Sequence, residues 1–285
     1  MTQNSIHTPN TETPTHALWR TLYEGLPLRV HPCAAPFVLG NLALWGVLFG
    51  LCLAFAPVLS SGVLVFGLMV SLWIILFFRH PERVIPEQTG IIVAPADGRI
   101  TSITQTTWPE ESGMADQKAW RISIFLNLWN VHIQRVALSG TVQNVIRVHG
   151  GYANAGCEAS AHKNTHCITH ILHESPVLDE KSETTPYSPV PYLIIQRAGF
   201  AARRIVQNLP KGTHTKTGDI LGLIKFGSRV DLYFPAHITP LVRIGQTMIG
   251  GESIIANCTR ISCQPPSPPP STPTPRPSPE TGEIP

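Results

Sequence analysis

The chain has 285 residues, 14% of them charged, and a formal net charge of +3. So small a net charge gives no indication of a nucleic-acid partner, although it suits a surface near anionic lipid. The six cysteines form no Cys-x-x-Cys pair, which argues against a small disulfide-stapled secreted protein. The apolar residues are unevenly spread, so the chain divides into segments of different kinds.

The N-terminal part predicts a tail followed by a hydrophobic hairpin. Residues 1–16 are rich in Thr, Asn and His and are expected to be disordered, and residues 17–36 form a basic juxtamembrane segment. Residues 37–78 carry no charged side chain, but Pro57 and a Ser-Ser-Gly sequence interrupt them. Each half is near the ~20 apolar residues that cross a bilayer, the second only if it begins around Val58. A helical hairpin buried in a soluble core is the alternative.

The charges that flank this hydrophobic run predict its orientation. Arg20 and Arg29 precede the run, Arg79 and Arg83 follow it, and the connecting turn has no basic residue. The positive-inside rule then places both ends in the cytoplasm. We therefore expect a protein of the cell membrane whose following domain lies on the cytoplasmic face. The sequence does not distinguish a spanning hairpin from a monotopic one.

The next segment, residues 79–263, has the pattern of a single β domain. Short apolar runs separated by Gly, Pro and Asn occur at 91–93, 120–125, 142–148, 192–195, 220–224, 230–234 and 254–255. We expect an antiparallel β barrel or sandwich, in which residues 212–222 resemble the hairpin of lipoyl-type domains. Residues 264–285 are rich in Pro, Ser and Thr and predict a second disordered tail.

A Gly-Ser step near the end of this domain suggests chemistry. The sequence Gly-Leu-Ile-Lys-Phe-Gly-Ser-Arg-Val-Asp at 222–231 places Ser228 after a strand-like run. The hydroxyl of Ser228 can attack the Gly227 carbonyl, so that the amide becomes an ester. Elimination and hydrolysis then leave a pyruvoyl group at Ser228, whose ketone can bind a substrate amine and act as an electron sink. Taken alone, a Gly-Ser pair is more typical of a turn.

Two further motifs fit the same chemistry. A Pro-Ala-Asp-Gly sequence places Asp97 at a strand end, and Val-His-Ile-Gln-Arg places His132 three residues before Arg135. By itself each is more typical of a turn aspartate or a structural histidine. Their order and their spacing from the Gly-Ser step resemble the phosphatidylserine decarboxylase family, in its short bacterial and archaeal form. The motifs at 77–83 and 198–205 are similar to that family as well.

The resemblance implies a pyruvoyl-dependent decarboxylase that converts phosphatidylserine to phosphatidylethanolamine and CO₂ in phospholipid biosynthesis. Ser228 is then both the maturation nucleophile and the source of the cofactor, and Gly227 is its partner at the cleavage site. We expect His132 to be the base and Asp97 to orient it, as in serine-protease triads. The two fragments, 1–227 and 228–285, are expected to stay together.

The resemblance also implies a substrate site and shows where this chain departs from its relatives. Arg135, Arg203 and Phe226 are expected to bind the membrane phospholipid substrate, since the Arg fork suits phosphate and carboxylate. The departures from the family pattern are at Ala137, Glu158 and Thr165. Four histidines at 162, 166, 170 and 173 have a helical spacing suited to a metal. Because residues 167–172 have a strand pattern instead, no metal site is predicted.

Two other functions remain open at this point. Ser228, His132 and Asp97 are also the residue types of a serine hydrolase, although the Gly-x-Ser-x-Gly elbow is missing. A non-catalytic membrane-anchored homologue is the other alternative, and the departures at Glu158 and Thr165 favour it. The sequence also leaves open whether the chain forms a homo-oligomer.

Overall fold

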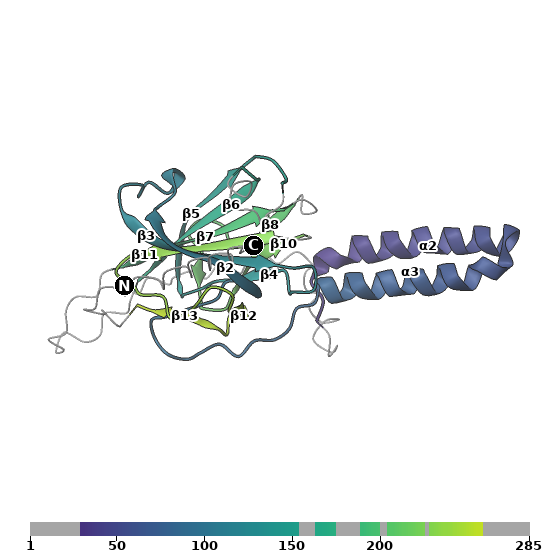
Figure 1. Ribbon diagram of the computed structural model, residues 1–285, viewed down its shortest axis with the longest axis horizontal. Coiled ribbons are helices and arrows are strands. Elements are labelled where there is room, and N and C mark those ends of the chain that lie inside the picture. The colour runs from purple at the N-terminus through teal and green to yellow at the C-terminus, as the bar shows by residue number, and fades with distance from the viewer. Residues whose placement is uncertain (1–28, 154–162, 175–188, 200–203, 226–227, 259–285) are drawn as a thin grey trace, which may run out of the picture.

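The computed structural model describes residues 29–153, 163–174, 189–199, 204–225 and 228–258. The two predicted tails, 1–16 and 264–285, lie outside these residues. Figure 1 shows a β domain from which a long pair of helices projects.

The hydrophobic run forms the two helices expected from the sequence, joined by a very short turn. A single 3-10 turn, η1 (Pro32–Ala34), leads into α2 (Ala35–Phe55), and α3 (Pro57–Phe77) follows after one residue, Ala56. Proline is well suited to the first position of a helix because it has no N–H to satisfy there. The Ser-Ser-Gly sequence therefore continues α3 instead of breaking it, and both helices reach 21 residues.

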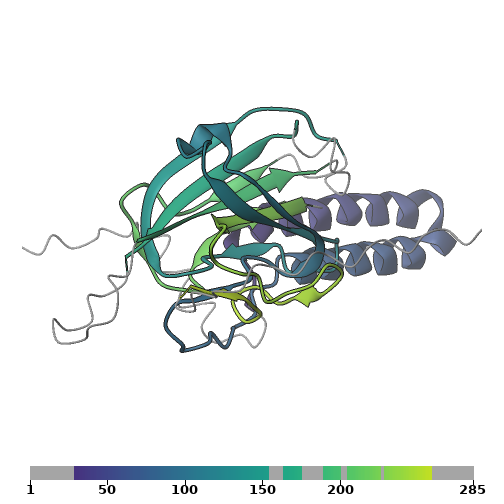
Figure 2. The ribbon, with the colours of Figure 1, turned by 60° about the vertical axis from the view of Figure 1, so that its left-hand side comes forward.

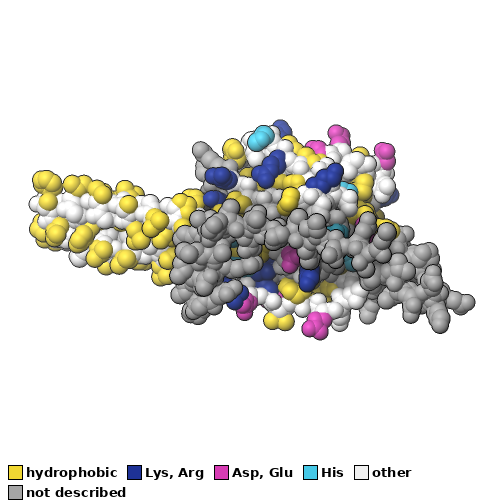
Figure 3. Space-filling view, turned by 180° about the vertical axis from the view of Figure 1, so that it is seen from behind, with side chains coloured by type: hydrophobic (Ala, Val, Ile, Leu, Met, Phe, Trp, Pro, Cys, Tyr) yellow, Lys and Arg dark blue, Asp and Glu magenta, His cyan; other side chains and the backbone are white. Residues whose placement is uncertain are grey.

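Both helices are long and apolar enough to cross a membrane. Large apolar side chains cover their outer surface, and Figure 3 shows hydrophobic atoms along the whole projecting pair. So large an exposed apolar surface is not typical of a soluble domain. The N-terminal helices thus indicate that the protein associates with a membrane.

Small and polar residues let the two helices approach closely. A Cβ atom at Gly67 would lie 2.6 Å from the Cβ of Trp45, so only glycine fits at this contact. The Asn41 amide donates to the Ser71 hydroxyl at 2.7 Å, and the Trp45 indole donates to Asn41 at 3.0 Å. Small residues and hydrogen bonds of this kind hold helices together in lipid, where the hydrophobic effect does not act between them.

An eight-stranded antiparallel sheet forms most of the domain. Its strands are, in spatial order, β12 (Thr247–Met248), β2 (Gly98–Thr107), β3 (Lys118–Leu126), β11 (Ser228–Pro235), β7 (Val190–Ala198), β6 (His166–His173), β5 (Gly140–Val148) and β9 (His214–Thr215). Only a 3-10 turn, η2 (Glu110–Ser112), interrupts the loop between β2 and β3 in the described residues. The two edge strands are two residues long, which leaves little free edge for pairing with another chain.

Two small sheets complete the domain. One contains β4 (Ile133–Arg135), β10 (Ile220–Ile224) and β8 (Ile205–Gln207), and the other pairs β1 (Ile91–Val93) with β13 (Ile254–Asn257). The large sheet curls around them as a half-barrel, as Figure 2 shows. Irregular register within β2 and β5 accompanies this curl, because a bulge increases the local twist of a strand.

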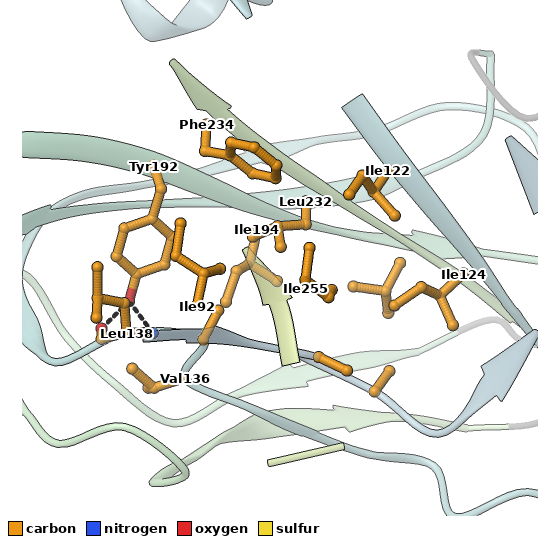
Figure 4. Packing of buried hydrophobic residues seen from close by; sticks show 14 of the residues in the cluster. Ile92, Ile122, Ile124, Val136, Leu138, Tyr192, Ile194, Leu232, Phe234 and Ile255 are labelled. Atoms are coloured by element: carbon orange, nitrogen blue, oxygen red, sulfur yellow. Dashed lines mark hydrogen bonds between the residues drawn. The ribbon is translucent and has the colours of Figure 1, made fainter. Parts of the chain in front are cut away.

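The core lies between the large sheet and the small ones. Figure 4 shows side chains from β1, β3, β7, β11 and β13 pointing toward one another, with the Tyr192 hydroxyl hydrogen-bonded to the backbone of Leu138. A second apolar cluster joins the base of the hairpin to the domain. It contains Phe77 of α3 and the next residue, Phe78, together with Val131, Ile133 and Leu223 near β4 and β10. The hairpin is therefore packed on the domain by its last turn.

The predicted apolar strands are confirmed, whereas one predicted motif is not. Each of the seven runs expected from the sequence lies within a strand. The lipoyl-type hairpin expected at 212–222 does not form, because β9 pairs with β5 while β10 pairs with β4 and β8. The turn between them, closed by a bond from the Lys216 N–H to the Asp219 carboxylate, instead connects two different sheets.

Candidate active site

Ser228 is the first residue of β11, in the middle of the large sheet. It pairs with Leu126 of β3 on one side and with Ala198 of β7 on the other. Because side chains alternate along a strand, Ser228 shares the core-facing side with Val230 and Leu232. Its side chain is fully buried, and its hydroxyl has no hydrogen-bond partner among the described residues.

His132 is buried just before β4, and one of its ring nitrogens is hydrogen-bonded while the other is not. Its Nδ1 lies 2.9 Å from the Asn130 carbonyl oxygen. A carbonyl only accepts, so Nδ1 must carry the hydrogen and Nε2 must hold the free lone pair. Nε2 is buried and has no partner in the described part of the chain. Burial, helped by the nearby positive charge of Arg79, lowers the pKa of His132 to about 4, so that the ring is neutral at pH 7.

The end of the hairpin supports this histidine directly. The ring of Phe77, the last residue of α3, lies 4.2 Å from the ring of His132, measured between centroids. The Arg79 guanidinium donates to the Leu76 carbonyl and, at 2.7 Å, to the carbonyl of Trp129 in the turn before His132. The end of α3 and the residues that follow it therefore help to hold the imidazole in place.

The strand pairing brings Ser228 and His132 to the same end of the domain. Ser228 is opposite Leu126, and the turn at 127–130 leads directly from Leu126 to His132. On the other side of the Gly-Ser step, the Ile224 N–H donates to the His132 carbonyl at 3.3 Å. The chain is thus held to the His132 segment both before and after the residues 226–227, which lie outside the described part.

Asp97 does not orient His132, contrary to the expectation from the sequence. Its carboxylate accepts two bonds from Arg83, at 2.9 and 2.7 Å, and a third from the Gly250 N–H at 2.7 Å. The Asn130 carbonyl takes the place next to His132 Nδ1 that a triad aspartate would occupy. Asp97 instead ties the segment that leaves the hairpin to the loop between β12 and β13.

Arg135 also has a different role from the one expected. Its side chain is buried, and its two terminal nitrogens donate to backbone carbonyls, to Gly218 at 2.8 Å and to Pro81 at 3.0 Å. One N–H of each terminal nitrogen thus holds the segment that follows α3 against the turn before β10. In the described residues these bonds give the arginine a structural role.

A buried pair of glutamines, which the sequence reasoning missed, lies behind His132. The Gln134 amide donates to the His132 carbonyl at 2.8 Å, and Gln196 donates to the Gln134 side-chain oxygen at 2.9 Å. Both side chains are fully buried, and the Gln196 oxygen has no partner among the described residues. The only sequence feature that could have identified these two glutamines is an uncharged polar side chain at a core-facing position of a strand.

Gly222 allows this network to form, and its replacement tests the packing. A Cβ atom there would lie 2.1 Å from the Val206 carbonyl oxygen and 3.1 Å from the Gln196 amide nitrogen. We expect Gly222→Ala to lower the free energy of unfolding by about 1–3 kcal/mol through overpacking. The urea midpoint of purified protein in detergent measures this. Gly151→Ala, whose Cβ would meet its nearest atom at 3.7 Å, is the control and should differ little from the parent.

An ion cluster lies on the opposite face of the sheet, directly after Ser228. The Asp231 carboxylate accepts from Arg197 and from Arg229, each at 2.6 Å, and Arg229 also donates to Ser123 at 2.8 Å. Burial opposes ionisation of Asp231, but the two guanidinium groups outweigh it and lower the pKa of the carboxyl. The cluster joins β3, β7 and β11 around the first residues of β11.

Three expected site residues, Arg203, Phe226 and Gly227, lie outside the described residues, as does the departure at Glu158. At the other two positions that depart from the family pattern, Ala137 is buried in the core, and the Thr165 hydroxyl bonds to the backbone of Gly150. Among the described residues, no group of three His, Cys, Asp or Glu side chains is arranged to bind a metal. His166, His170 and His173 lie along one strand, β6.

Comparison with known proteins gives the family. The sequence profile described as phosphatidylserine decarboxylase matches residues 70–256. The chain belongs to the phosphatidylserine decarboxylase family. It is 36% identical, over 229 residues, to the phosphatidylserine decarboxylase proenzyme of Granulibacter bethesdensis, an alignment covering 80% of this chain and 85% of the relative. The proenzymes of Gluconacetobacter diazotrophicus, at 35% identity (80% and 94% covered), and of Ruegeria pomeroyi, at 37% (67% and 81%), are similar too.

Membership of this family gives the class of chemistry. Its enzymes are pyruvoyl-dependent carboxy-lyases, made as proenzymes whose pyruvoyl group comes from a serine by self-cleavage. The described residues fit such a group at Ser228, because the buried hydroxyl lies at the start of a strand that both neighbours hold in place. The neutral Nε2 of His132 is a suitable proton acceptor at the same end of the domain.

Proposed function

We propose that this chain cleaves itself between Gly227 and Ser228 and then decarboxylates phosphatidylserine to phosphatidylethanolamine at the membrane. The observation that carries the assignment of residues is that two buried groups at one end of the domain lack hydrogen-bond partners in the described residues. The Ser228 hydroxyl and the His132 Nε2 are both without partners in the described residues, and both lie at one end of the domain. A buried polar group without a partner is costly, so its presence at a site suggests a role.

His132 acts as the base in maturation. Nε2 takes the proton of Ser228 as Oγ attacks the carbonyl carbon of Gly227. The oxygen–carbon bond forms, the carbon–nitrogen bond breaks, and the proton passes to the released nitrogen. Elimination then frees Gly227 as a carboxylate and leaves dehydroalanine at position 228. Water hydrolyses this dehydroalanine to the pyruvoyl group with loss of ammonia. The Asn130 carbonyl keeps the hydrogen on Nδ1, so that Nε2 is the nitrogen that takes up and returns the Ser228 proton.

His132 also serves the decarboxylation. A pyruvoyl group supplies a ketone that binds the substrate amine and accepts the electrons released when CO₂ leaves. The chain's own contribution is to hold the substrate at the end of β11 and to relay a proton. His132 Nε2 takes up the proton that the substrate ammonium releases and passes it to the carbon that has lost CO₂. The low pKa of the buried imidazole makes its protonated form a strong donor.

The catalytic unit spans residues 79–263 and lies on the cytoplasmic face of the cell membrane. The hairpin at 37–78 anchors it, and the basic residues before and after the hairpin support this orientation. After cleavage, the fragments 1–227 and 228–285 remain associated. The pairing of β11 with both β3 and β7 supports this association.

Intact mass of the purified protein, beside a Ser228→Ala variant, tests the proposal. We expect two fragments that separate between Gly227 and Ser228, with the smaller blocked at its N-terminus by a pyruvoyl group. Ser228→Ala should remain a single chain without decarboxylase activity. A parent protein that stays uncut and inactive toward phosphatidylserine would refute this function and leave the non-catalytic homologue. An uncut protein that hydrolyses esters would indicate the serine hydrolase.

A further inference from the structure

We propose that the turn at 127–130 is a second membrane contact, which docks in the headgroup region of the bilayer beside the hairpin and thereby holds the catalytic histidine at the lipid surface. This inference rests on the proposed function for the role of His132. The docking itself follows from exposed side chains, charges and hydrogen bonds in the described residues.

The turn presents two large apolar side chains to solvent. Leu128 is 43% exposed and Trp129 is 69% exposed. The backbone beneath them is fixed, because the Asn127 side chain accepts from the N–H groups of Trp129 and Asn130 at 2.9 and 3.1 Å. Adjacent leucine and tryptophan side chains that a fixed turn exposes to water indicate an interaction surface.

The position of the turn matches the level where a bilayer would end. Arg79, two residues after α3, donates to the Trp129 carbonyl, so the turn is attached to the base of the hairpin. Figure 1 shows β4, which begins just after this turn, next to the ends of α2 and α3. Tryptophan is enriched at this level of membrane proteins because its ring is apolar and its N–H is polar.

Basic side chains near the hairpin base favour phospholipid as the partner. Arg79 is bonded to the turn itself, and Lys225 lies with its ammonium 4.7 Å from the centre of the Phe37 ring, near the start of α2. These two residues place positive charge at the hairpin base, whereas the exposed Arg29 is paired with Glu82. An anionic headgroup layer over apolar chains complements both features. A bilayer therefore fits this surface better than an apolar protein partner does.

Docking would act on the catalytic histidine through the backbone of the turn. The Asn130 carbonyl, one residue after Trp129, bonds to His132 Nδ1 and fixes its tautomer. Movement of the turn would therefore move this carbonyl and the imidazole that it holds. A bilayer that immobilises Leu128 and Trp129 would keep Nε2 in place where phospholipid enters the site.

Fluorescence quenching tests the docking without using catalysis. Ser228→Ala protein is reconstituted in vesicles of phosphatidylcholine and phosphatidylglycerol, with some lipids brominated near the top of the acyl chain. The fluorescence of Trp129 is obtained as the difference between the emission of this protein and that of the Ser228→Ala/Trp129→Phe variant. We expect that difference to be quenched in brominated vesicles. A Trp129 contribution equal in brominated and ordinary vesicles would overturn the docking and leave the proposed function intact.

Turnover then tests the consequence for catalysis. The Leu128→Ala/Trp129→Ala variant is assayed on phosphatidylserine in vesicles and on dispersed short-chain phosphatidylserine. We expect its loss of decarboxylation rate to be about tenfold larger on the vesicles, because two interfacial side chains are lost. Trp129→Phe should restore most of the vesicle rate, and Leu241→Ala, at an exposed leucine beside β13, should match the parent. Equal losses on both substrates would contradict the coupling. Absence of self-cleavage in every protein would instead refute the proposed function, while the quenching result would still stand.

Discussion

Replacing His132 by alanine is expected to slow self-cleavage by about 10²–10⁴-fold, the usual contribution of a positioned base. The reason is the single lone pair on Nε2, which the bond from Nδ1 to the Asn130 carbonyl keeps available. Refolding of denatured precursor into detergent, followed by electrophoresis over time, measures the rate. His237→Ala, at an exposed histidine after β11, is the control and should cleave like the parent.

The pH dependence of the same reaction follows from the buried environment of His132. Because burial lowers its pKa to about 4, the base stays neutral down to that pH. The cleavage rate of the folded precursor should be nearly constant from pH 7 to 5 and then fall as pH drops through about 4. A solvated histidine would lose activity near pH 6.5 instead. Far-UV circular dichroism at each pH separates this loss from unfolding, and a midpoint near 6.5 would contradict the assignment.

Asp231→Asn is expected to cause the largest loss of stability among substitutions near the site. The change keeps the shape of the side chain but removes the negative charge between Arg197 and Arg229. Breaking a buried ion cluster in this way typically costs about 3–5 kcal/mol, because the remaining charges stay buried. Urea unfolding in detergent, monitored by tryptophan fluorescence, measures the change in the free energy of unfolding.

The comparison is best made in the Ser228→Ala background, where the chain stays uncut and unfolding concerns one molecule. Asp219→Asn provides the matched control, because this aspartate is exposed and its carboxylate accepts a bond from the Lys216 N–H in a turn. Its loss should cost less than about 1 kcal/mol, as for other exposed charges. If Asp231→Asn were as mild as Asp219→Asn, the cluster would not be holding β11 in place.

The sequence was a good guide to the apolar strands, which came from local patterns. Ser228 and His132, the reacting groups that we propose, came from motifs whose residue types the chemistry requires. β2 was missed because its sequence, Gly-Arg-Ile-Thr-Ser-Ile-Thr-Gln-Thr-Thr, is polar and its burial is partial along most of its length. Polar strands of this kind are stabilised by pairing with neighbours, which a local pattern does not contain.

The partners of the site residues could not be predicted, because they depend on contacts between distant segments. Asp97 meets Arg83 and Gly250, which lie 14 and 153 residues away in the chain. His132 is held by a backbone carbonyl, and any residue type can supply one. Arg135 looked like a phosphate ligand because a guanidinium binds carbonyls and phosphates by the same donors. Residue type indicates what a group can bind, whereas the fold decides what it meets.

The central position of β11 determines the order of folding and self-cleavage. A cut before Ser228 would leave this strand with hydrogen-bonded neighbours on both sides, β3 and β7. The smaller fragment could then leave only if the centre of the sheet opened. Folding must therefore be complete before the cut, while one continuous chain still supplies the strand. Once cut and denatured, two separate molecules would have to find each other, so the mature enzyme is expected to lose its activity irreversibly on unfolding.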